Sequence, residues 1–368
     1  MTSVRNVETL ADRLAARTLE LVDIPSVSLS EDAIREHVMT LVPAGLVAEY
    51  AGDEAFFFIP ANRRDAPLVV LAGHYDTVPT QGNLPGRLRD GAVHGLGASD
   101  MKGGLAVALE LVRDLEDRSP GPFDVGLVLF GREELPDEYN PLPALFEGSS
   151  AIHDTALAIV LEPTDGRIQA GCLGNVVARL VFTGRSGHSA RPWLADSAIA
   201  RAVADLPSIL ALEPRGAVID GLEFKEVVAV TRLESGIADN VIPGEAIATI
   251  NLRYPPDRDP EQAESYLRSL TPAGATIEIL SNAPPARVVT DSRLVRALSA
   301  AGNLAIEAKQ AWTNVADFTA NGIDAVNFGP GHTAYAHRQD ERVEIAALVH
   351  AYETLERFLC GAIVEDAT

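Results

Sequence analysis

The hydrophobic positions in the first half of the chain follow two alternating spacings. Apolar side chains recur at helical intervals from Leu10 to Val22 and from Ile34 to Leu41, which predicts two amphipathic helices. Short apolar runs bounded by glycine, proline or charge predict buried strands, and a further helix is expected over 101–115. The strand runs are 56–59, 68–72, 125–130 and 157–161. This alternation is typical of an α/β domain whose sheet is covered by helices.

The pattern changes after about residue 175. It then runs strand, helix, strand, strand, helix, strand, in the segments 176–183, 197–212, 226–233, 246–254, 259–270 and 276–280. This is the order of a ferredoxin-like unit, which can bury a core of its own. A helix over 292–301, a strand over 325–328 and a helix over 343–359 resume the first pattern. The sequence therefore predicts an α/β domain with a mixed sheet between helices, built from 1–174 and 286–368, with an α+β domain inserted at 175–285.

Charge and composition exclude several classes of protein. The chain has 30 basic and 52 acidic residues and a formal charge of −22, which argues against nucleic-acid binding. No apolar run reaches the length of a membrane span, and charges interrupt what would be the apolar part of an export signal. Cys172 and Cys360 lie far apart, so no disulfide framework is indicated. We expect a cytoplasmic protein that acts on a small molecule, without a membrane partner.

Polar side chains follow three of the predicted strands. His74 comes just after the strand 68–72, Glu133 and Glu134 follow 125–130, and Glu162 follows 157–161. Open α/β sheets place ligands at the carboxyl ends of their strands. Taken singly, each motif is more readily explained as an exposed strand end or a solvated loop.

Two further motifs carry candidate ligands. Asp100 stands in the glycine-rich stretch GLGASDMKGG, where it could simply cap a helix, and His337 precedes the last helix in AHRQDE. Together the motifs supply two imidazoles and three carboxylates, a set that suits two divalent ions sharing one carboxylate, with zinc expected first and cobalt or manganese as alternatives. Such ions polarise a carbonyl and lower the pKa of water, which leaves Glu133 as the natural general base. The predicted ligands are His74, Asp100, Glu134, Glu162 and His337.

The motifs GHYDTVP, GLGASDMKGG, GREE, LEP and AHRQDE, in this order, resemble the M20 family of dinuclear zinc amidohydrolases and peptidases. The resemblance implies a catalytic domain with an inserted ferredoxin-like lid. It implies that His74 and Glu162 hold one zinc, that Glu134 and His337 hold the other, and that Asp100 bridges the two.

The resemblance also implies roles for neighbouring residues. Asp76 would orient His74, Glu133 would activate the water, and the peptide bond between Asp100 and Met101 would be cis. In the family, the histidine of a GHS motif reaches across a dimer to stabilise the oxyanion, so His188 would complete the site of the other subunit. A homodimer through the lid domain is therefore expected.

Other positions resemble the family's substrate contacts. Arg191, Asn240 and Arg253 are the expected donors from the lid, since arginine suits bidentate binding of carboxylates. Thr313 and Gly331 are expected near His337.

Within the family, ARPW, PDEYNPLPALFEG, AWTNVADF and NFGPG resemble the actinobacterial type of succinyl-diaminopimelate desuccinylase. This implies hydrolysis of N-succinyl-LL-2,6-diaminopimelate to succinate and LL-diaminopimelate, in lysine and cell-wall biosynthesis. Asn314 and Asp317 depart from that type, which usually has aspartate and arginine there, and an anion facing a tricarboxylate would weaken binding. Alternatives are acetylornithine deacetylase, another acyl-amino-acid deacylase or carboxypeptidase, and a non-hydrolytic metal-binding relative.

Overall fold

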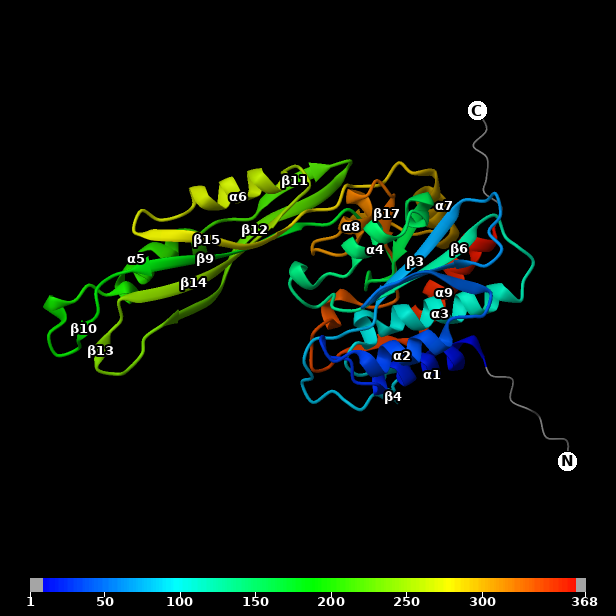
Figure 1. Ribbon diagram of the computed structural model, residues 1–368, viewed down its shortest axis with the longest axis horizontal. Coiled ribbons are helices and arrows are strands. Elements are labelled where there is room, and N and C mark those ends of the chain that lie inside the picture. Colours follow the sequence, from blue (N-terminus) through cyan, green and yellow to red (C-terminus); the bar gives the residue numbers. More distant parts are fainter. Residues whose placement is uncertain (1–8, 362–368) are drawn as a thin grey trace. The chain divides into compact units, whose positions relative to one another are not determined.

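The computed structural model describes residues 9–361, which divide into two compact units (Figure 1). Unit 1 comprises the chain up to Ala170, Val289–Glu307, and the chain from Thr313 onward, and unit 2 comprises Gly171–Val288 and Ala308–Trp312. The short segment Ala308–Trp312 belongs to unit 2 because the side-chain amide of Gln310 bonds the backbone of β12 in that unit. Each unit has its own sheet.

The main sheet of unit 1 is mixed, with the order β1-β2-β6-β3-β7-β17-β8-β16. Its strands are β1 Leu46–Ala51, β2 Ala55–Pro60, β3 Leu68–His74, β6 Asp124–Phe130, β7 Thr155–Val160, β8 Ile168–Ala170, β16 Ile306–Ala308 and β17 Ala325–Asn327. β3 runs parallel to both β6 and β7. Every residue of β3 is buried, which explains the unbroken apolar run Leu68–Ala72 at its start. The four strands predicted from apolar runs are confirmed.

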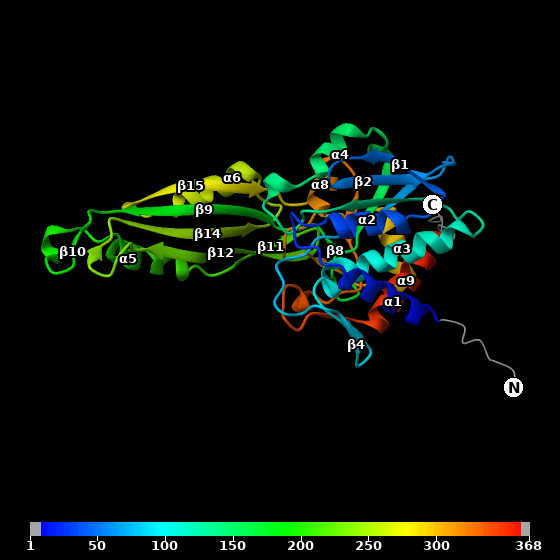
Figure 2. The same ribbon diagram turned by 60° about the horizontal axis from the view of Figure 1, so that its bottom comes forward.

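Helices cover both faces of this sheet (Figure 2). They are α1 Leu10–Asp23, α2 Asp32–Leu41, α3 Gly103–Glu116, α4 Leu142–Gly148, α7 Arg293–Gly302, α8 Val315–Ala320 and α9 Ile345–Cys360. α1, α3 and α9 pack against one another. On the other face, α4 and α8 meet through the rings of Phe146 and Phe318, 5.3 Å apart and nearly perpendicular. Thr9 begins α1 with a capping box completed by Asp12.

The predicted start of the third helix is wrong. α3 begins at Gly103 rather than Met101, because Asp100 (φ −125°, ψ 95°) and Met101 (φ −130°, ψ 36°) lie outside the helical region. Residues Ala98–Lys102 instead form a wide turn before the helix. The peptide bond between Asp100 and Met101 is cis, as the family resemblance implied.

A small antiparallel sheet completes unit 1. It has the order β18-β5-β4, with β4 Arg87–Arg89, β5 Ala92–His94 and β18 Arg342–Glu344. Strands of three residues carry too little periodicity to be predicted from sequence.

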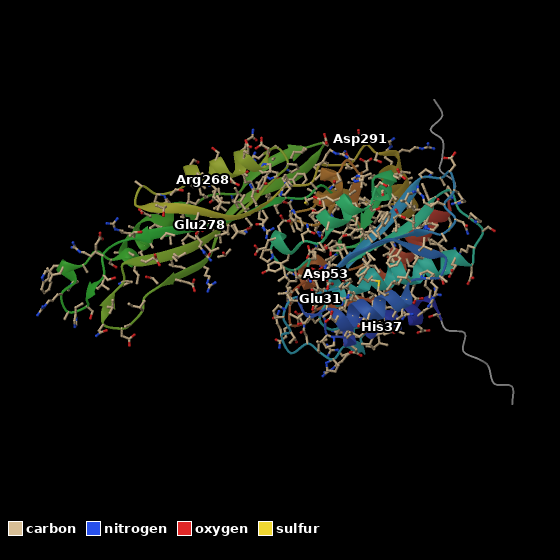
Figure 3. The ribbon with its side chains drawn as sticks, in the orientation of Figure 1. Glu31, His37, Asp53, Arg268, Glu278 and Asp291 are labelled. Carbon is tan, nitrogen blue, oxygen red and sulfur yellow. The ribbon has the colours of Figure 1, made fainter. Side chains whose placement is uncertain are left out.

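The sheet of unit 2 has the order β11-β12-β14-β9-β15 and is antiparallel. Its elements are β9 Gly174–Thr183, α5 Ala198–Leu210, β11 Arg215–Ile219, β12 Leu222–Ser235, β14 Glu245–Tyr254, α6 Pro260–Ser269 and β15 Ala275–Ala283, beside a two-residue ladder of β10 Gly187–His188 with β13 Val241–Ile242. α5 and α6 share one apolar core with the sheet. The predicted ferredoxin-like elements are present in the predicted order, and β11 is an additional strand that was not predicted. Arg268 on α6 and Glu278 on β15 are exposed (Figure 3). Among the described residues, none of the helices combines the length and apolar character needed to cross a membrane.

Candidate metal centre

Three parallel strands bring their carboxyl ends to one edge of the main sheet. His74 ends β3 and lies opposite Phe130, the last residue of β6. Glu133 and Glu134 follow β6, and Glu162 follows β7, whose Val160 pairs with Ala72. Because adjacent parallel strands end together, side chains that follow them converge. The register therefore explains why these four residues lie close together.

A first ligand group consists of His74, Asp100 and Glu162. Nε2 of His74 lies 3.3 Å from Oδ1 of Asp100 and 3.7 Å from Oε1 of Glu162. The three ligand atoms all lie within 4.8 Å of one another. One imidazole and two carboxylates at this spacing could hold a divalent cation.

A second ligand group consists of Asp100, Glu134 and His337. Nε2 of His337 lies 3.0 Å from Glu134 and 3.5 Å from Oδ2 of Asp100, and this group also fits within 4.8 Å. Asp100 thus offers one carboxylate oxygen to each group, which is the arrangement of a bridging ligand. The structure brings together all five predicted ligands.

Glu133 also lies in this cluster. Its carboxylate forms a third compact group with His74 and Glu134, but it takes no part in the two groups that share Asp100. Glu133 therefore lies beside the two ligand groups.

Asp76 fixes the two strand ends against each other. Its carboxylate accepts the backbone N–H groups of Glu133 and Glu134, at 3.1 and 3.2 Å, and the hydroxyl of Ser28 at 2.6 Å. It also lies 3.4 Å from Nδ1 of His74. Burial alone would raise the pKa of Asp76, but these bonds and His74 lower it overall. Asp76 is thus an ionised carboxylate that holds His74 with Nε2 toward the ligand groups.

Glu341 positions Asp100. Its carboxylate accepts the backbone N–H groups of Gly97, Ser99 and Asp100 at 3.0 to 3.1 Å. Burial raises the pKa of Glu341 to about 7, although these bonds oppose the shift. Glu341, four residues after His337, therefore holds the turn Ala98–Lys102 in place.

The electrostatics of the cluster fit a cation. Burial and the neighbouring carboxylates raise the pKa of Glu133 well above its usual range, and burial raises the pKa of Glu134. Hydrogen bonding to Glu134 raises the pKa of His337 to about 9. Crowded carboxylates with raised pKa values are those whose charge an added cation would stabilise. Together with two imidazole nitrogens, this donor set suits divalent metal ions.

The loop after β6 is anchored from outside the cluster. Arg132 bonds Asp53 at 3.0 Å, and the N–H of Gly131 bonds the carbonyl of Glu54 at 2.9 Å. Buried Tyr75 donates its hydroxyl to the carboxylate of Glu54 at 2.6 Å. These contacts fix the backbone that carries Glu133 and Glu134.

Comparison with known proteins shows where this arrangement belongs. The sequence pattern of Peptidase family M20/M25/M40 matches residues 70–360. The chain belongs to this family. It is therefore a hydrolase, and the residue groups above are its candidates for holding divalent metal ions.

Curated M20 relatives match nearly the whole chain. The chain is 37% identical over 348 residues to the putative succinyl-diaminopimelate desuccinylase of Mycobacterium tuberculosis, covering 94% of this chain and 97% of that protein. It is 35% identical over 356 residues to the succinyl-diaminopimelate desuccinylase of Corynebacterium glutamicum, covering 93% and 95%. In fold it is similar to an M20 family metallo-carboxypeptidase of Sulfolobus solfataricus, with a TM-score of 0.73, 19% identity and coverage of 95% and 98%.

The expected lid residues of this M20 chain lie in unit 2. His188 is exposed on β10, and its Nδ1 accepts the N–H of Ala190 at 3.0 Å. The carbonyl of Asn240 accepts the N–H of Ser189 at 2.9 Å, so Asn240 lies beside His188. Arg191 is exposed, and Nε of Arg253 donates to Asn251 at 2.9 Å. Their roles toward a substrate stay predictions.

Thr313 and Gly331 are both buried in unit 1. The hydroxyl of Thr313 donates to the side-chain oxygen of Asn327 at 3.0 Å. A Cβ on Gly331 would lie 2.4 Å from the carbonyl oxygen of Ser99, so only glycine lets this backbone pack against the turn that carries Asp100. These contacts give both residues a structural function, and substrate binding by them stays a prediction.

Asp317, the residue that departs from the desuccinylase pattern, is held inside unit 1. Its two carboxylate oxygens accept the side-chain N–H groups of Asn140 and Asn314, each at 3.0 Å. Burial raises the pKa of Asp317 to about 6, although both bonds oppose the shift. The two departures, Asn314 and Asp317, are thus partners of each other.

Sequence reasoning missed the functions of two residues at the site. Ser28, which bonds Asp76, carries no recognisable motif. Glu341 lies in the AHRQDE motif. The only sequence signal for its function was an acidic residue four positions after His337. The backbone groups that it binds, in residues 97–100, are distant from it in sequence.

Proposed function

We propose that this M20 hydrolase cleaves N-succinyl-LL-2,6-diaminopimelate into succinate and LL-diaminopimelate. The reaction would use two divalent metal ions, and zinc is the expected metal. The observation that carries the proposal is the pair of ligand groups that share Asp100, in a chain that is 35–37% identical to proteins named for this reaction. The acyl group is the finer part of the proposal, because the ligand groups are compatible with any amide substrate.

The ions would be held by the two groups already described, His74, Asp100 and Glu162 for one and Asp100, Glu134 and His337 for the other. When bound, such ions polarise the scissile carbonyl and make water a better nucleophile near neutral pH. Asp76 keeps Nε2 of His74 aimed at its group. Glu341 keeps Asp100 between both groups through the backbone of residues 97–100.

Glu133 acts as the general base in this proposal. Its carboxylate belongs to the cluster but not to the groups that share Asp100, so it is available to accept a proton from the attacking water. The same carboxyl then returns the proton to the nitrogen that leaves as the amine.

Unit 2 supplies the donors for the anionic parts of the substrate. Arg191, Asn240 and Arg253 would bind carboxylates, with Thr313 and Gly331 contributing from unit 1. His188 would donate to the oxyanion of the other subunit, since Nδ1 is occupied by Ala190 and Nε2 remains to donate.

The open edge of β12 supports a homodimer through unit 2. β11 pairs with residues 222–226 only, so within the described chain residues 227–235 have a strand neighbour on one side alone. Exposed apolar side chains lie on the adjoining helix and strand end; they are Ile199, Val203 and Leu210 on α5, and Leu233 and Ile237. An unpaired edge beside apolar surface is a template for a second copy.

Light scattering after size exclusion tests the dimer. We expect wild type to run as a dimer and Val203→Glu to run as a monomer, because the substitution adds charge to the apolar surface. Val218→Glu changes a valine on β11 that is even more exposed than Val203 and should remain dimeric. A monomeric wild type would remove the role of His188 in the other subunit.

Steady-state assays test the reaction. We expect zinc-loaded protein to hydrolyse succinyl-diaminopimelate with a higher kcat/KM than acetylornithine. Absence of succinyl-diaminopimelate turnover at high substrate concentration would contradict the proposed reaction. Turnover of acetylornithine alone would favour an acetylornithine deacetylase.

A variant separates the base from the ligands. Glu133→Gln should abolish hydrolysis of either substrate while metal analysis still finds two ions per chain, whereas Glu134→Gln should lower metal content. Retained activity in Glu133→Gln would rule out the base assignment.

A further inference from the structure

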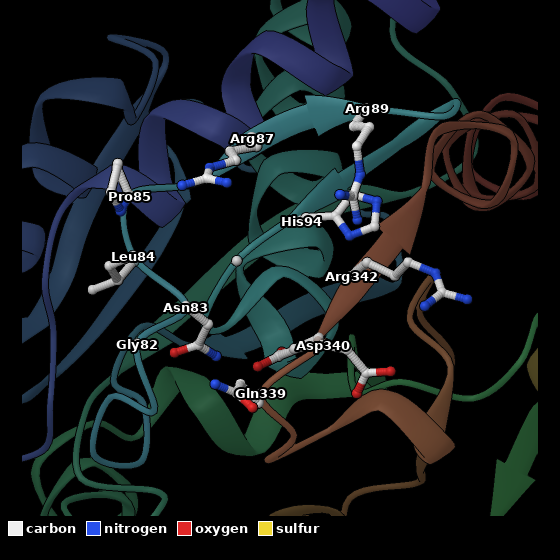
Figure 4. Close-up of a pocket in the computed structure, with 12 residues that line it drawn as sticks. Gly82, Asn83, Leu84, Pro85, Arg87, Arg89, His94, Gln339, Asp340 and Arg342 are labelled. Atoms are coloured by element: carbon white, nitrogen blue, oxygen red, sulfur yellow. The ribbon is translucent and has the colours of Figure 1, made fainter.

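A cavity of about 430 Å³ lies in unit 1, beside the small sheet (Figure 4). We call it the β4–β5 pocket. Four of its lining residues are basic in type, namely Arg87, Arg89, His94 and Arg342, and the others include residues 82–85 and 339–341. Of the described residues that form the two ligand groups, none lines it. The pocket is therefore a separate feature from the metal centre.

The register of the small sheet places the basic side chains on one face. Arg342 pairs with His94, and His94 pairs with Arg87, so the three form one row across β18, β5 and β4. Paired residues on antiparallel strands project to the same side, with Cβ atoms about 4.5–5.5 Å apart. Arg89 follows two residues after Arg87 and so projects to that side too. Val93 and Val343 point the other way and are buried.

Acidic neighbours of this row are already engaged. Asp340 is bound by Arg338 through two contacts of 2.8 and 3.1 Å. Glu341 accepts three backbone N–H groups at the metal centre. Glu344 pairs with Arg342 at 3.2 Å, and Asp90 pairs with Arg89 at 3.3 Å at the exposed hairpin tip.

Two residues of the row still have nitrogen atoms that bind no described residue. Arg87 makes no hydrogen bond or ion pair with any described residue, and Nε2 of His94 is buried without a hydrogen-bond partner among them. The guanidinium of Arg342 also stacks over the ring of Tyr335, 3.9 Å from its centre, which fixes its orientation. In a chain of charge −22, this row is a local concentration of basic side chains, which would attract an anion.

We propose that the β4–β5 pocket binds a small multivalent oxyanion between Arg87, His94 and Arg342. The guanidinium of Arg87 can bind the oxygens of a carboxylate or phosphate in pairs. Arg342 adds its charge and the nitrogen that bonds neither Glu344 nor Tyr335, and the imidazole of His94 adds one more donor. The ligand could carry either kind of oxygen, so the shared chemistry is that of a compact oxyanion with at least two negative charges. This proposal does not depend on the substrate of the metal centre.

Isothermal titration of the metal-loaded, full-length protein tests the proposal. One arm uses pyrophosphate and the other succinate, and the tighter ligand identifies whether phosphate or carboxylate is preferred. We expect Arg87→Ala to weaken binding about tenfold or more, because a charge-assisted pair is lost. Arg87→Lys keeps the charge but loses the paired donors and should weaken binding less.

Controls separate this pocket from other anion sites. Arg268→Ala removes an exposed arginine on α6 (Figure 3) and should leave the titration unchanged. Anions bound at the metal centre would be insensitive to Arg87→Ala, so the difference between wild type and that variant reports the pocket alone. Turnover of Arg87→Ala should equal that of wild type, which shows that the variant is folded. Equal binding by wild type and Arg87→Ala, or no binding of either anion at millimolar concentration, would overturn the proposal.

Discussion

Asp317→Asn offers a quantitative test of the interior of unit 1. The carboxylate accepts one amide hydrogen each from Asn140 and Asn314, and its burial raises its pKa to about 6. In the unfolded chain an aspartate titrates near 3.9. The folded and unfolded states therefore bind different numbers of protons between about pH 4 and pH 6.

The direction of the effect follows from that difference. In this window the folded protein keeps a proton that the unfolded chain has released, so the free energy of unfolding falls as the pH rises. A shift of about two pKa units corresponds to about 3 kcal/mol, at 1.36 kcal/mol per unit. The stabilising contribution is complete below about pH 4 and lost above about pH 6.

Asparagine does not titrate, so the variant lacks this contribution. Relative to wild type, Asp317→Asn should gain about 3 kcal/mol in free energy of unfolding between pH 4 and pH 7. Any constant cost from the altered hydrogen bonds shifts the whole curve and leaves its slope unchanged.

Urea unfolding of the metal-depleted proteins at several pH values measures the difference. Depletion removes the pH dependence of ion binding from both proteins. Asp65→Asn, which changes an exposed carboxylate, is the matched control and should parallel wild type at every pH. If Asp317→Asn also parallels wild type, the Asp317 carboxylate is solvated and the argument for its raised pKa fails.

Three further substitutions test individual contacts. Asp76→Asn should weaken metal binding about 10- to 100-fold, measured by competition with a chelator, because His74 loses its charged partner; Asp65→Asn, which changes an exposed carboxylate outside the ligand groups, should leave the affinity unchanged. Gly104→Ala should destabilise by about 1–3 kcal/mol or more, since its Cβ would lie 2.3 Å from the carbonyl oxygen of Leu161, whereas at Gly216 no atom lies closer than 4.0 Å and alanine should be tolerated. Tyr75→Phe should cost about 1–3 kcal/mol in urea unfolding, because the buried carboxylate of Glu54 loses a donor; an unchanged midpoint would contradict this.

Long periodic segments made most of the fold predictable. α1 and β3 follow the predicted ranges because a helix or strand of that length repeats its burial pattern several times. The order of elements in unit 2 was predictable for the same reason. The start of α3 was not, because the backbone of Asp100 and Met101 is set by contacts with Glu341, which is distant in sequence.

The site was predictable where topology alone brings residues together. His74, Glu134 and Glu162 follow neighbouring parallel strands, so their convergence follows from the sheet. Asp100 and His337 lie on loops, so the sheet topology does not place them. They could be predicted as ligands only from the combined motifs and the family resemblance. Asp317 was expected to matter for substrate binding, but single-residue comparison could not show that its amide partners come from 140 and 314.

The charge of the chain acquires a different meaning once the site is known. Many of the carboxylates at the metal centre have a defined partner or would be neutralised by two cations. The net charge of the chain, −22, is far larger than the positive charge that two divalent ions would add. For an anionic substrate, the field of the whole protein would then oppose approach, so recognition must depend on a few local donors. The described cluster at the metal centre consists mainly of carboxylates, which accept hydrogen bonds and do not donate them. The predicted carboxylate donors Arg191 and Arg253 are therefore where specificity for the proposed substrate should be tested.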